Sequence, residues 1–483
     1  MGQCPCNKDQ DPNYLKVYEL KIASLLELDE TQLNISKEFH ESSYLPFIEA
    51  LAINSSNINL VKINILDLTN CLLGRPGIQL LSECKQLYNL YKLNLSKNII
   101  GSYGLQSLEK CNFLYNLKSL NLSFNDLTDD SLNYIKKCTF LKQLHYLNLK
   151  SNNLGPNSIK NFSQLTFLSE LSYLNLSKNY IDYGLSNFHE CKFLSNLKTL
   201  NISFNAFEAV CITYLSKCTF LSNLTLLNLK GNFVREEGMK TLKDCNFLSK
   251  LSILEISENY LGAEGIKYLV DCTFLNNLKS LYLEKNYIDE EGMNYLSSCS
   301  FLNNLKVLDL SNNILGPNGI KNFSKCSYLT SLQILLLNDN NIKPEGIQWL
   351  SKCSFLSNLS NLNLKRNTIG PSGIKFFQEC KFLSKLRDLD ISYNYILNEG
   401  IDYLIECVFL SELRNLDLFG NFFDQEGLDE INNCMFLSIE IKDAINLTLN
   451  LKINNKQTEN VNEDELTKYE LNEYFTNDFS NFI

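Results

Sequence analysis

Residues 308–332 read LDLSNNILGPNGIKNFSKCSYLTSL, and the same pattern recurs along most of the chain. Its clearest marker is an asparagine, Asn313 in this copy, which returns at a nearly constant spacing. Eleven of the twelve intervals between these asparagines are 27 residues, and the interval from Asn179 to Asn205 is 26. The column comprises Asn98, Asn125, Asn152, Asn179, Asn205, Asn232, Asn259, Asn286, Asn313, Asn340, Asn367, Asn394 and Asn421. Such a period is typical of a solenoid, in which each repeat packs only against its neighbours.

Each repeat predicts a strand, a turn and a helix. Leu308 and Leu310 lie two residues apart and therefore point to one face of a strand, while the intervening residues point to the other. The asparagine turns the chain, and its amide is expected to satisfy backbone groups that the bend leaves free. Ile320 and Phe323 follow at three-residue spacing, which indicates one face of a helix. Gly319, six residues after the asparagine, is expected to mark the start of that helix.

This arrangement resembles the leucine-rich repeat family, and specifically its ribonuclease-inhibitor type, over residues 60–440. The resemblance implies an α/β leucine-rich repeat solenoid, a horseshoe with parallel strands on the concave face and helices on the convex face. Elementary spacing agrees with this expectation. Strands stack about 4.8 Å apart whereas helices need about 8–10 Å, so an array of both must curve toward its strands.

The repeats divide the chain into four predicted segments. Residues 1–13 are expected to be a disordered N-terminus, and residues 14–60 an N-terminal capping region with a strand at 32–37 and a helix at 44–51. Residues 61–440 form the solenoid of about 14 repeats of 27 residues. Residues 441–483 are expected to be a C-terminal cap and acidic tail, in which the alternation at 446–454 (NLTLNLKIN) predicts a last strand.

The 17 cysteines indicate reduced, buried thiols, not a disulfide framework. Thirteen share one position of the repeat, where neighbouring helices are about 8–10 Å apart. A disulfide needs Cα atoms within about 7 Å, so the column is expected to consist of small buried hydrophobes. Reduced thiols in this number indicate a cytosolic or nuclear site, of which we expect the cytoplasmic one. The column comprises Cys84, Cys111, Cys138, Cys191, Cys218, Cys245, Cys272, Cys299, Cys326, Cys353, Cys380, Cys407 and Cys434.

Several function classes find no support in the sequence. The net charge of −10 and pI near 5.1 argue against a nucleic-acid partner. The chain shows no phosphate-binding loop, dinucleotide fingerprint, kinase signature or metal-ligand spacing. His40, His145 and His189 lie in unrelated contexts. We therefore expect a non-enzymatic, monomeric protein without metal or cofactor.

The first residues, MGQCPC, are the one targeting signal in the sequence. Gly2 follows the initiator methionine as in an N-myristoylation site, and Cys4 and Cys6 are candidates for palmitate. The usual pattern has Ser or Thr where Cys6 stands. A single acyl chain binds membranes only marginally, so membrane tethering is expected only if Gly2 or the cysteines are acylated. The alternative is a free tail.

The outward strand positions are the predicted binding surface, because a parallel sheet presents them as a rigid array. They are basic or neutral in the early repeats, with Lys97, Lys150, Lys178 and Lys230. They become acidic later, with Glu255, Glu258, Glu284, Asp309, Asp339, Asp390 and Asp417. Exposed aromatic residues in a polar field are typical interface anchors, although a solvated face with incidental aromatics is the plain alternative. The predicted residues for a protein partner on the concave face are Phe124, Phe204, Tyr282, Glu284, Arg366, Tyr393 and Phe419.

An alternative function rests on a second resemblance. Ran GTPase-activating proteins use the same repeat type and carry a catalytic arginine in a loop after an early repeat strand. Arg75 stands in the matching segment LLGRP, at 72–76. The resemblance implies that Arg75 stabilises charge on the phosphoryl group of a small GTPase. The repeats are more regular, and the acidic tail shorter and less dense, than in that family.

Overall fold

The computed structural model describes residues 14–28, 31–35, 45–52 and 60–455. The chain forms two compact units, residues 1–341 and residues 342–483, and each is considered by itself. Gly2, Cys4, Cys6, His40 and the acidic tail from residue 456 lie outside the described residues.

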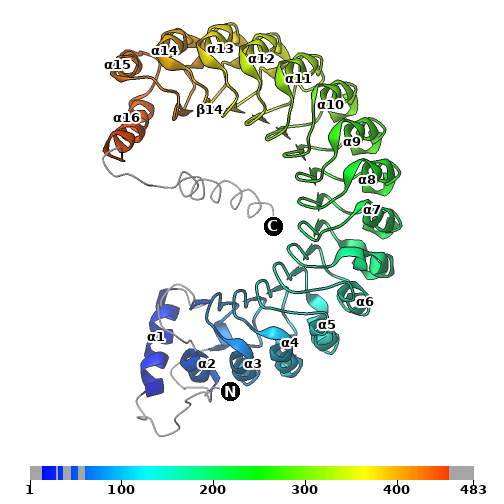
Figure 1. The fold of residues 1–483 in the computed structure, drawn as a ribbon. Helices are drawn as coiled ribbons and strands as arrows, with labels where there is room; N and C mark the ends of the chain where they lie inside the picture. Colours follow the sequence, from blue (N-terminus) through cyan, green and yellow to red (C-terminus); the bar gives the residue numbers. More distant parts are fainter. Residues whose placement is uncertain (1–13, 29–30, 36–44, 53–59, 456–483) are drawn as a thin grey trace. The chain divides into compact units, whose positions relative to one another are not determined.

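The first unit is built on short parallel strands, one from each repeat. Each strand pairs with the next in the chain, and equivalent residues face each other, as Leu281 faces Leu254 and Leu308. These strands line the inner side of an arc and the helices its outer side (Figure 1). The strands are β1 Gln32–Asn34, β2 Ile65–Asp67, β3 Lys92–Asn94, β4 Ser119–Asn121, β5 Tyr146–Asn148, β6 Tyr173–Asn175, β7 Thr199–Asn201, β8 Leu226–Asn228, β9 Ile253–Glu255, β10 Ser280–Tyr282, β11 Val307–Asp309 and β12 Ile334–Leu336.

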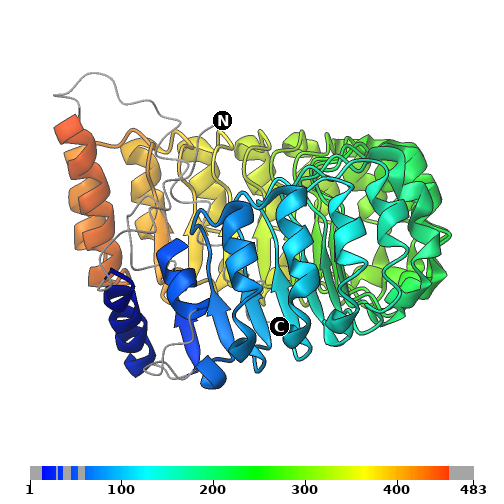
Figure 2. The same cartoon turned by 90° about the horizontal axis from the view of Figure 1, so that it is seen from below.

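The helices of the first unit lie side by side (Figure 2). The repeat that is one residue short has the 3-10 helix η6 instead of an α-helix. The α-helices are α1 Tyr14–Leu28, α2 Leu45–Ala52, α3 Gly74–Leu81, α4 Gly101–Leu105, α5 Ser131–Ile135, α6 Ser158–Phe162, α7 Ala209–Leu215, α8 Arg235–Leu242, α9 Gly262–Leu269, α10 Glu290–Leu296 and α11 Gly316–Phe323. The 3-10 helices are η1 Leu60–Lys62, η2 Lys85–Leu87, η3 Gln106–Lys110, η4 Asn112–Leu114, η5 Thr139–Gln143, η6 Asp182–Glu190, η7 Lys192–Asn196, η8 Thr219–Leu221, η9 Asn246–Leu248, η10 Thr273–Leu275 and η11 Ser300–Leu302.

The repeated asparagine joins each repeat to the one before it. Asn125 is fully buried, and its Nδ2 donates to the carbonyl oxygens of Leu95 at 2.8 Å and Ser123 at 3.1 Å. Its Oδ1 accepts from the backbone N–H of Asn98 at 3.0 Å and of Ile100 at 3.4 Å. The predicted role of the amide at the bend is therefore confirmed. Because Leu95, Asn98 and Ile100 belong to the preceding repeat, the side chain also fixes the stacking of repeats.

The glycine column has a different role from the predicted one. Gly104 lies inside α4 and is buried, so it does not mark the beginning of the helix. A Cβ there would lie 2.5 Å from Ile100 Cγ2 and 3.5 Å from Arg75 Cα of the previous repeat. The glycine therefore makes room for Ile100, the residue just before the helix of the same repeat, while the preceding helix lies at ordinary contact distance. The glycines with left-handed φ stand elsewhere, as at Gly101, with φ +59°.

The cysteines are reduced and buried wherever the structure describes them, as predicted. Each column member lies just after the helix and not on it. Cys84, for example, precedes η2 with φ −76° and ψ 56°. Its Sγ lies 3.5 Å from the carbonyl oxygen of Leu80. Burial raises the pKa of the Cys84 thiol to about 12, with a smaller contribution from Glu83.

The second unit repeats the same plan and ends in a long helix. Its strands are β13 Asn361–Asn363, β14 Asp388–Asp390 and β15 Asn415–Asp417. Its α-helices are α12 Lys343–Leu350, α13 Gly370–Phe377, α14 Leu397–Ile405, α15 Gln425–Asn433 and α16 Ile439–Asn455. Its 3-10 helices are η12 Ser354–Leu356, η13 Lys381–Leu383 and η14 Val408–Leu410.

The strand predicted at 446–454 is wrong, because these residues belong to α16. Alternating leucines suggested a strand, but the apolar residues that are buried are Ile441 and Ile445, four apart on one side of the helix. Leu447 is exposed. The helix contacts β15, so it covers the last strand of the sheet.

Candidate functional site

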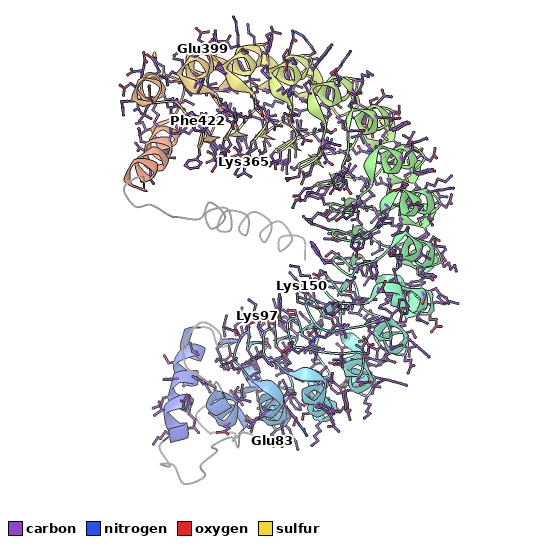
Figure 3. All side chains as sticks on the ribbon, viewed as in Figure 1. Glu83, Lys97, Lys150, Lys365, Glu399 and Phe422 are labelled. Carbon is purple, nitrogen blue, oxygen red and sulfur yellow. The ribbon has the colours of Figure 1, made fainter. Side chains whose placement is uncertain are left out.

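The strand face is the set of outward side chains on the strands and on the two residues that precede each repeated asparagine. In the first unit Lys97 and Lys150 point to the inner side of the arc, whereas Glu83 points outward from the helical side (Figure 3). In the second unit Lys365 lies on the strand side and Glu399 on the helical side (Figure 3). The strand face thus carries a different set of side chains from the helical face in both units.

The backbone before the repeated asparagine has a left-handed conformation, which favours Gly and Asn. Gly231 and Asn312 occupy this position in two repeats, with φ 66° and 55°. Phe124 and Phe204 adopt it with φ 56° and 53°. A bulky residue in this region costs on the order of 1–2 kcal/mol. The fold needs only a turn there, so the aromatic side chains are not required by the turn.

Phe124 and Phe204 are the predicted anchors of the first unit, and both are exposed, at 42% and 36%. Phe124 lies beneath two ammonium groups, with Lys97 Nζ 5.7 Å and Lys150 Nζ 5.9 Å from its ring centroid. Phe204 lies beneath Lys178, with Nζ 5.3 Å from the ring centroid. These are cation–π distances.

Gly231 leaves the space that the Phe204 ring occupies. A Cβ at this glycine would collide with the ring. The same arrangement recurs in the second unit, where a Cβ at Gly420 would lie 2.6 Å from Tyr393 Cδ1. In both places a glycine in the next repeat lets an aromatic ring lie across the strand face.

Lys230 does not contribute free positive charge to the early repeats. Its Nζ lies 2.9 Å from Glu284 and 3.3 Å from Glu258, two repeats and one repeat further on. Burial lowers the pKa of Lys230, but the carboxylates of Glu284, Glu255 and Glu258 outweigh that effect and raise it. Ion pairs therefore join the basic and acidic parts of the strand face where one gives way to the other. Glu284 already has Lys230 as its partner in the free protein.

Two acidic residues predicted on the open face are buried. Glu255 and Asp309 are 7% and 4% exposed, because each turns back onto its own strand end. Glu255 Oε1 accepts from the backbone N–H of Ser257 at 3.0 Å, and Asp309 Oδ1 accepts from that of Ser311 at 2.9 Å. Burial raises the pKa of Glu255 to about 7 and that of Asp309 to about 6. Tyr282, between them, is half-buried.

The predicted residues of the second unit form one cluster around Tyr393. The ring of Phe419 meets that of Tyr393 edge to face, with centroids 5.4 Å apart. The guanidinium carbon of Arg366 lies 5.0 Å, and Lys365 Nζ 5.5 Å, from the Tyr393 ring centroid. The structure therefore brings Arg366, Tyr393 and Phe419 together.

Two groups of aromatic residues were not predicted from the sequence. Tyr146 and Tyr173 begin β5 and β6 on the strand face, and their rings stack with centroids 4.2 Å apart. A second group, here called the turn row, comprises the residues after the repeated asparagine in three successive repeats. Phe233, Tyr260 and Tyr287 are exposed and stack at 5.7 and 5.6 Å. The aromatic column beside the asparagine in the sequence is the signal that could have found the turn row.

Arg75 lies in the first turn of α3 and is exposed. It therefore belongs to a helix and not to the loop that the resemblance implied. His145 and His189 each place Nδ1 within hydrogen-bonding distance of a backbone carbonyl, of Gln143 at 2.7 Å and of Ser186 at 2.8 Å. Among the described residues, no His, Cys, Asp and Glu side chains gather in a group that could hold a metal ion. No helix within the described ranges is long and apolar enough to span a membrane.

The family model described as leucine-rich repeat matches residues 116–135, 301–324 and 328–351. Each match spans parts of a repeat that the structure shows as strand, turn or helix. The fold is a leucine-rich repeat solenoid. No curated protein sequence matches it.

A solved leucine-rich repeat structure agrees with this fold. The chain is similar to a leucine-rich repeat protein of Leptospira interrogans, at 23% identity over 79% of this chain and 90% of that one, with a TM-score of 0.51. An internalin of Listeria monocytogenes is 21% identical over 71% of this chain and 93% of that one, with a TM-score of 0.48. A plant peptide hormone receptor, solved in complex with RGF2, is 17% identical over 77% of this chain and 68% of that one, with a TM-score of 0.33.

Proposed function

We propose that this leucine-rich repeat protein is a non-enzymatic scaffold that binds a protein partner through its strand face. The observation that carries the proposal is the placement of Phe124, Phe204 and Tyr393. Each stands where the turn favours Gly or Asn, and each has positive φ. The turn is left-handed in the other repeats too, with Lys97 and Ser151 among the residues that occupy it, so the fold does not call for an aromatic side chain there and a ring in this position suits a role in binding.

The chemistry of these residues suits a protein partner. Aromatic side chains with adjacent cations supply large contact areas and are enriched among the residues that dominate binding energy. Gly231 and Gly420 keep the rings of Phe204 and Tyr393 lying across the strand face. Such fixed rings lose little conformational freedom when a partner binds.

The finer features of the protein are proposed on separate grounds. The α-helix found in most repeats supports the ribonuclease-inhibitor type. The buried free thiols support a cytoplasmic location. A monomer is proposed for the free protein, and membrane attachment only if Gly2, Cys4 or Cys6 is acylated.

The test is to capture a partner from native extract with the tagged full-length protein, identify it by mass spectrometry and measure its affinity for variants. Phe124→Ala, Phe204→Ala and Tyr393→Ala should each weaken binding by about 1–2 kcal/mol. Phe124→Ala and Phe204→Ala should leave the free energy of unfolding nearly unchanged, because their side chains are exposed.

Matched variants distinguish the strand face from other surfaces. Tyr260→Ala and Tyr287→Ala remove similarly exposed aromatic rings from the turn row. Lys321→Ala and Lys375→Ala alter α11 and α13 on the helical side. A partner that tolerates every strand-face variant but is lost with the turn row or the helices would show that the proposed face is wrong.

A further inference from the structure

Among the described residues of the first unit, three lysines in the two positions that precede the repeated asparagine lack a carboxylate partner. Lys97, Lys150 and Lys178 form no ion pair there, in contrast to Lys230. None of the outward positions from β3 to β8 carries Asp or Glu. These lysines, with the two rings that they cover, are here called the lysine–phenylalanine patch. The patch comprises Lys97, Phe124, Lys150, Lys178 and Phe204.

The patch concentrates positive charge in the free protein. Lys150 is half-buried between its neighbours, and burial lowers its pKa, aided by the ammonium groups of Lys178 and Lys97. An anion bound among them would offset their mutual repulsion. Beyond the patch, the carboxylates of Glu258 and Glu284 already hold Lys230.

We propose that the lysine–phenylalanine patch binds an acidic, extended segment of a protein partner. This inference rests on the proposed function and names the chemistry of the partner for part of the same face. The backbone of such a segment lies across the strands, its carboxylates meet the three lysines, and its apolar side chains meet the two phenylalanine rings.

The dimensions of the patch fit a short extended segment. Lys97 and Lys178 lie three repeats apart, which corresponds to about 14 Å at the strand spacing of about 4.8 Å. An extended chain rises about 3.3 Å per residue, so about four to five residues span the three lysines and about six reach Phe204, one repeat further on. Successive side chains alternate in direction, so every second position of the segment faces the patch, and these positions carry both the carboxylates that meet the lysines and the apolar groups that meet the rings.

A longer polyanion such as RNA fits less well. The patch is followed by Glu258, after β9, and by Glu284, after β10. A strand of nucleic acid continuing along the face would meet these carboxylates. The net charge of −10 also opposes general attraction of a polyanion.

The experiment measures binding of a fluorescent peptide of alternating glutamate and alanine to the full-length protein by anisotropy. A peptide with glutamine in place of glutamate is the reference. The acidic peptide should bind about tenfold more tightly, and added salt should remove the difference. Equal binding of the two peptides would overturn the inference.

The site is tested with a triple variant, Lys97→Gln, Lys150→Gln and Lys178→Gln, and with Phe124→Ala. The control variant carries Lys110→Gln, Lys192→Gln and Lys240→Gln, which remove the same charge outside the strands. The patch variants should lose about tenfold in affinity and the control less than about twofold. Circular dichroism melting confirms that each variant is folded. Undiminished binding by a folded triple variant would contradict the proposal.

Two further comparisons identify the class of ligand and distinguish a failure of this inference from a failure of the proposed function. Oligouridine or anionic phospholipid vesicles that bind the patch lysines more tightly than the acidic peptide would reject a peptide ligand. If the acidic peptide fails to bind while a captured protein is still lost with Phe204→Ala or Tyr393→Ala, the inference fails and the proposed function stands. If the peptide binds but no captured protein responds to the strand-face variants, the proposed function fails.

Discussion

The position of Glu255 shows how one residue can be misjudged from its phase in a repeat. Its position in β9 predicts that its side chain points outward, but the carboxylate turns back to the backbone N–H of Ser257. The residue is only 7% exposed. The same holds for Asp309 and Ser311. Acidic residues in these positions replace the asparagines of earlier repeats, such as Asn228, whose Oδ1 accepts from the N–H of Lys230.

The burial of Glu255 predicts a pH-dependent loss of stability. Its pKa is raised from 4.5 to about 7 in the folded protein, so the folded state binds more protons than the unfolded state between those values. Stability therefore decreases as the pH rises through this window. Glu255→Gln keeps an acceptor for Ser257 and should raise the free energy of unfolding at pH 8, by at most about 3 kcal/mol.

Urea denaturation of both proteins at pH 5 and pH 8 measures this effect. The difference should be small at pH 5 and large at pH 8, because the wild-type carboxyl is protonated at the lower pH. Glu237→Gln, on an exposed position of α8, is the matched control. A difference that is the same at both pH values would contradict the prediction.

Arg75 is the one residue on which the GTPase-activator alternative rests. If that alternative is correct, the full-length protein accelerates GTP hydrolysis by a small GTPase. Arg75→Ala should then remove about 10³-fold or more of the acceleration. Arg235→Ala, in the first turn of α8, controls for the loss of an exposed helix arginine. Hydrolysis by a panel of GTPases that is unchanged by the protein, or full activity without Arg75, would reject the alternative.

At the scale of the element, the glycines of α13 separate two roles that the sequence does not distinguish. Gly370 has φ +60° and nothing within 4 Å of an added Cβ, whereas a Cβ on Gly373 would collide with Ile369. Gly373 also faces the backbone of Pro344 in the preceding helix, with Cα 3.4 Å from the added Cβ. Helix packing thus depends on Gly373, and backbone conformation on Gly370.

The paired variants Gly373→Ala and Gly370→Asn test this distinction. Gly373→Ala should reduce the free energy of unfolding by about 1–3 kcal/mol, because Ile369 and the backbone of Pro344 must move away from the added methyl group. Gly370→Asn should cost less than about 1 kcal/mol, since Asn tolerates a left-handed conformation. Equal losses in urea denaturation would show that close packing is not the reason for the column.

At the scale of the whole molecule, the buried thiols predict the chemical behaviour of the cysteines. The 15 cysteines that the structure describes are free and buried. Burial raises the pKa of thiols such as Cys245 and Cys299 to about 12, so almost no thiolate exists at neutral pH. Titration with a thiol reagent should find nearly all 17 cysteines in denaturant, and few under native conditions. Disulfides between column members in non-reducing peptide maps would contradict both the burial and the proposed location.

The sequence alone determined the features that repeat with the period. The strands, the turns, the burial of the cysteines and the role of the asparagine follow from residues that recur every 27 positions, because a solenoid gives equivalent positions equivalent surroundings. Phe124 and Phe204 could be placed on the strand face for the same reason. Their phase in the repeat was enough.

Only the tertiary structure decided what depends on contacts between particular repeats. Lys230 meets Glu284 across 54 residues, a pairing that depends on side-chain reach and not on phase. The tight space at Gly104 depends on the side chain of Ile100 in the same repeat, and the direction of Glu255 on a local turn. Helix α16 lies outside the period, where alternating leucines gave the wrong element. The physical reason is common to all four: the period specifies which face a residue occupies, whereas burial, pairing and packing depend on the atoms that surround it.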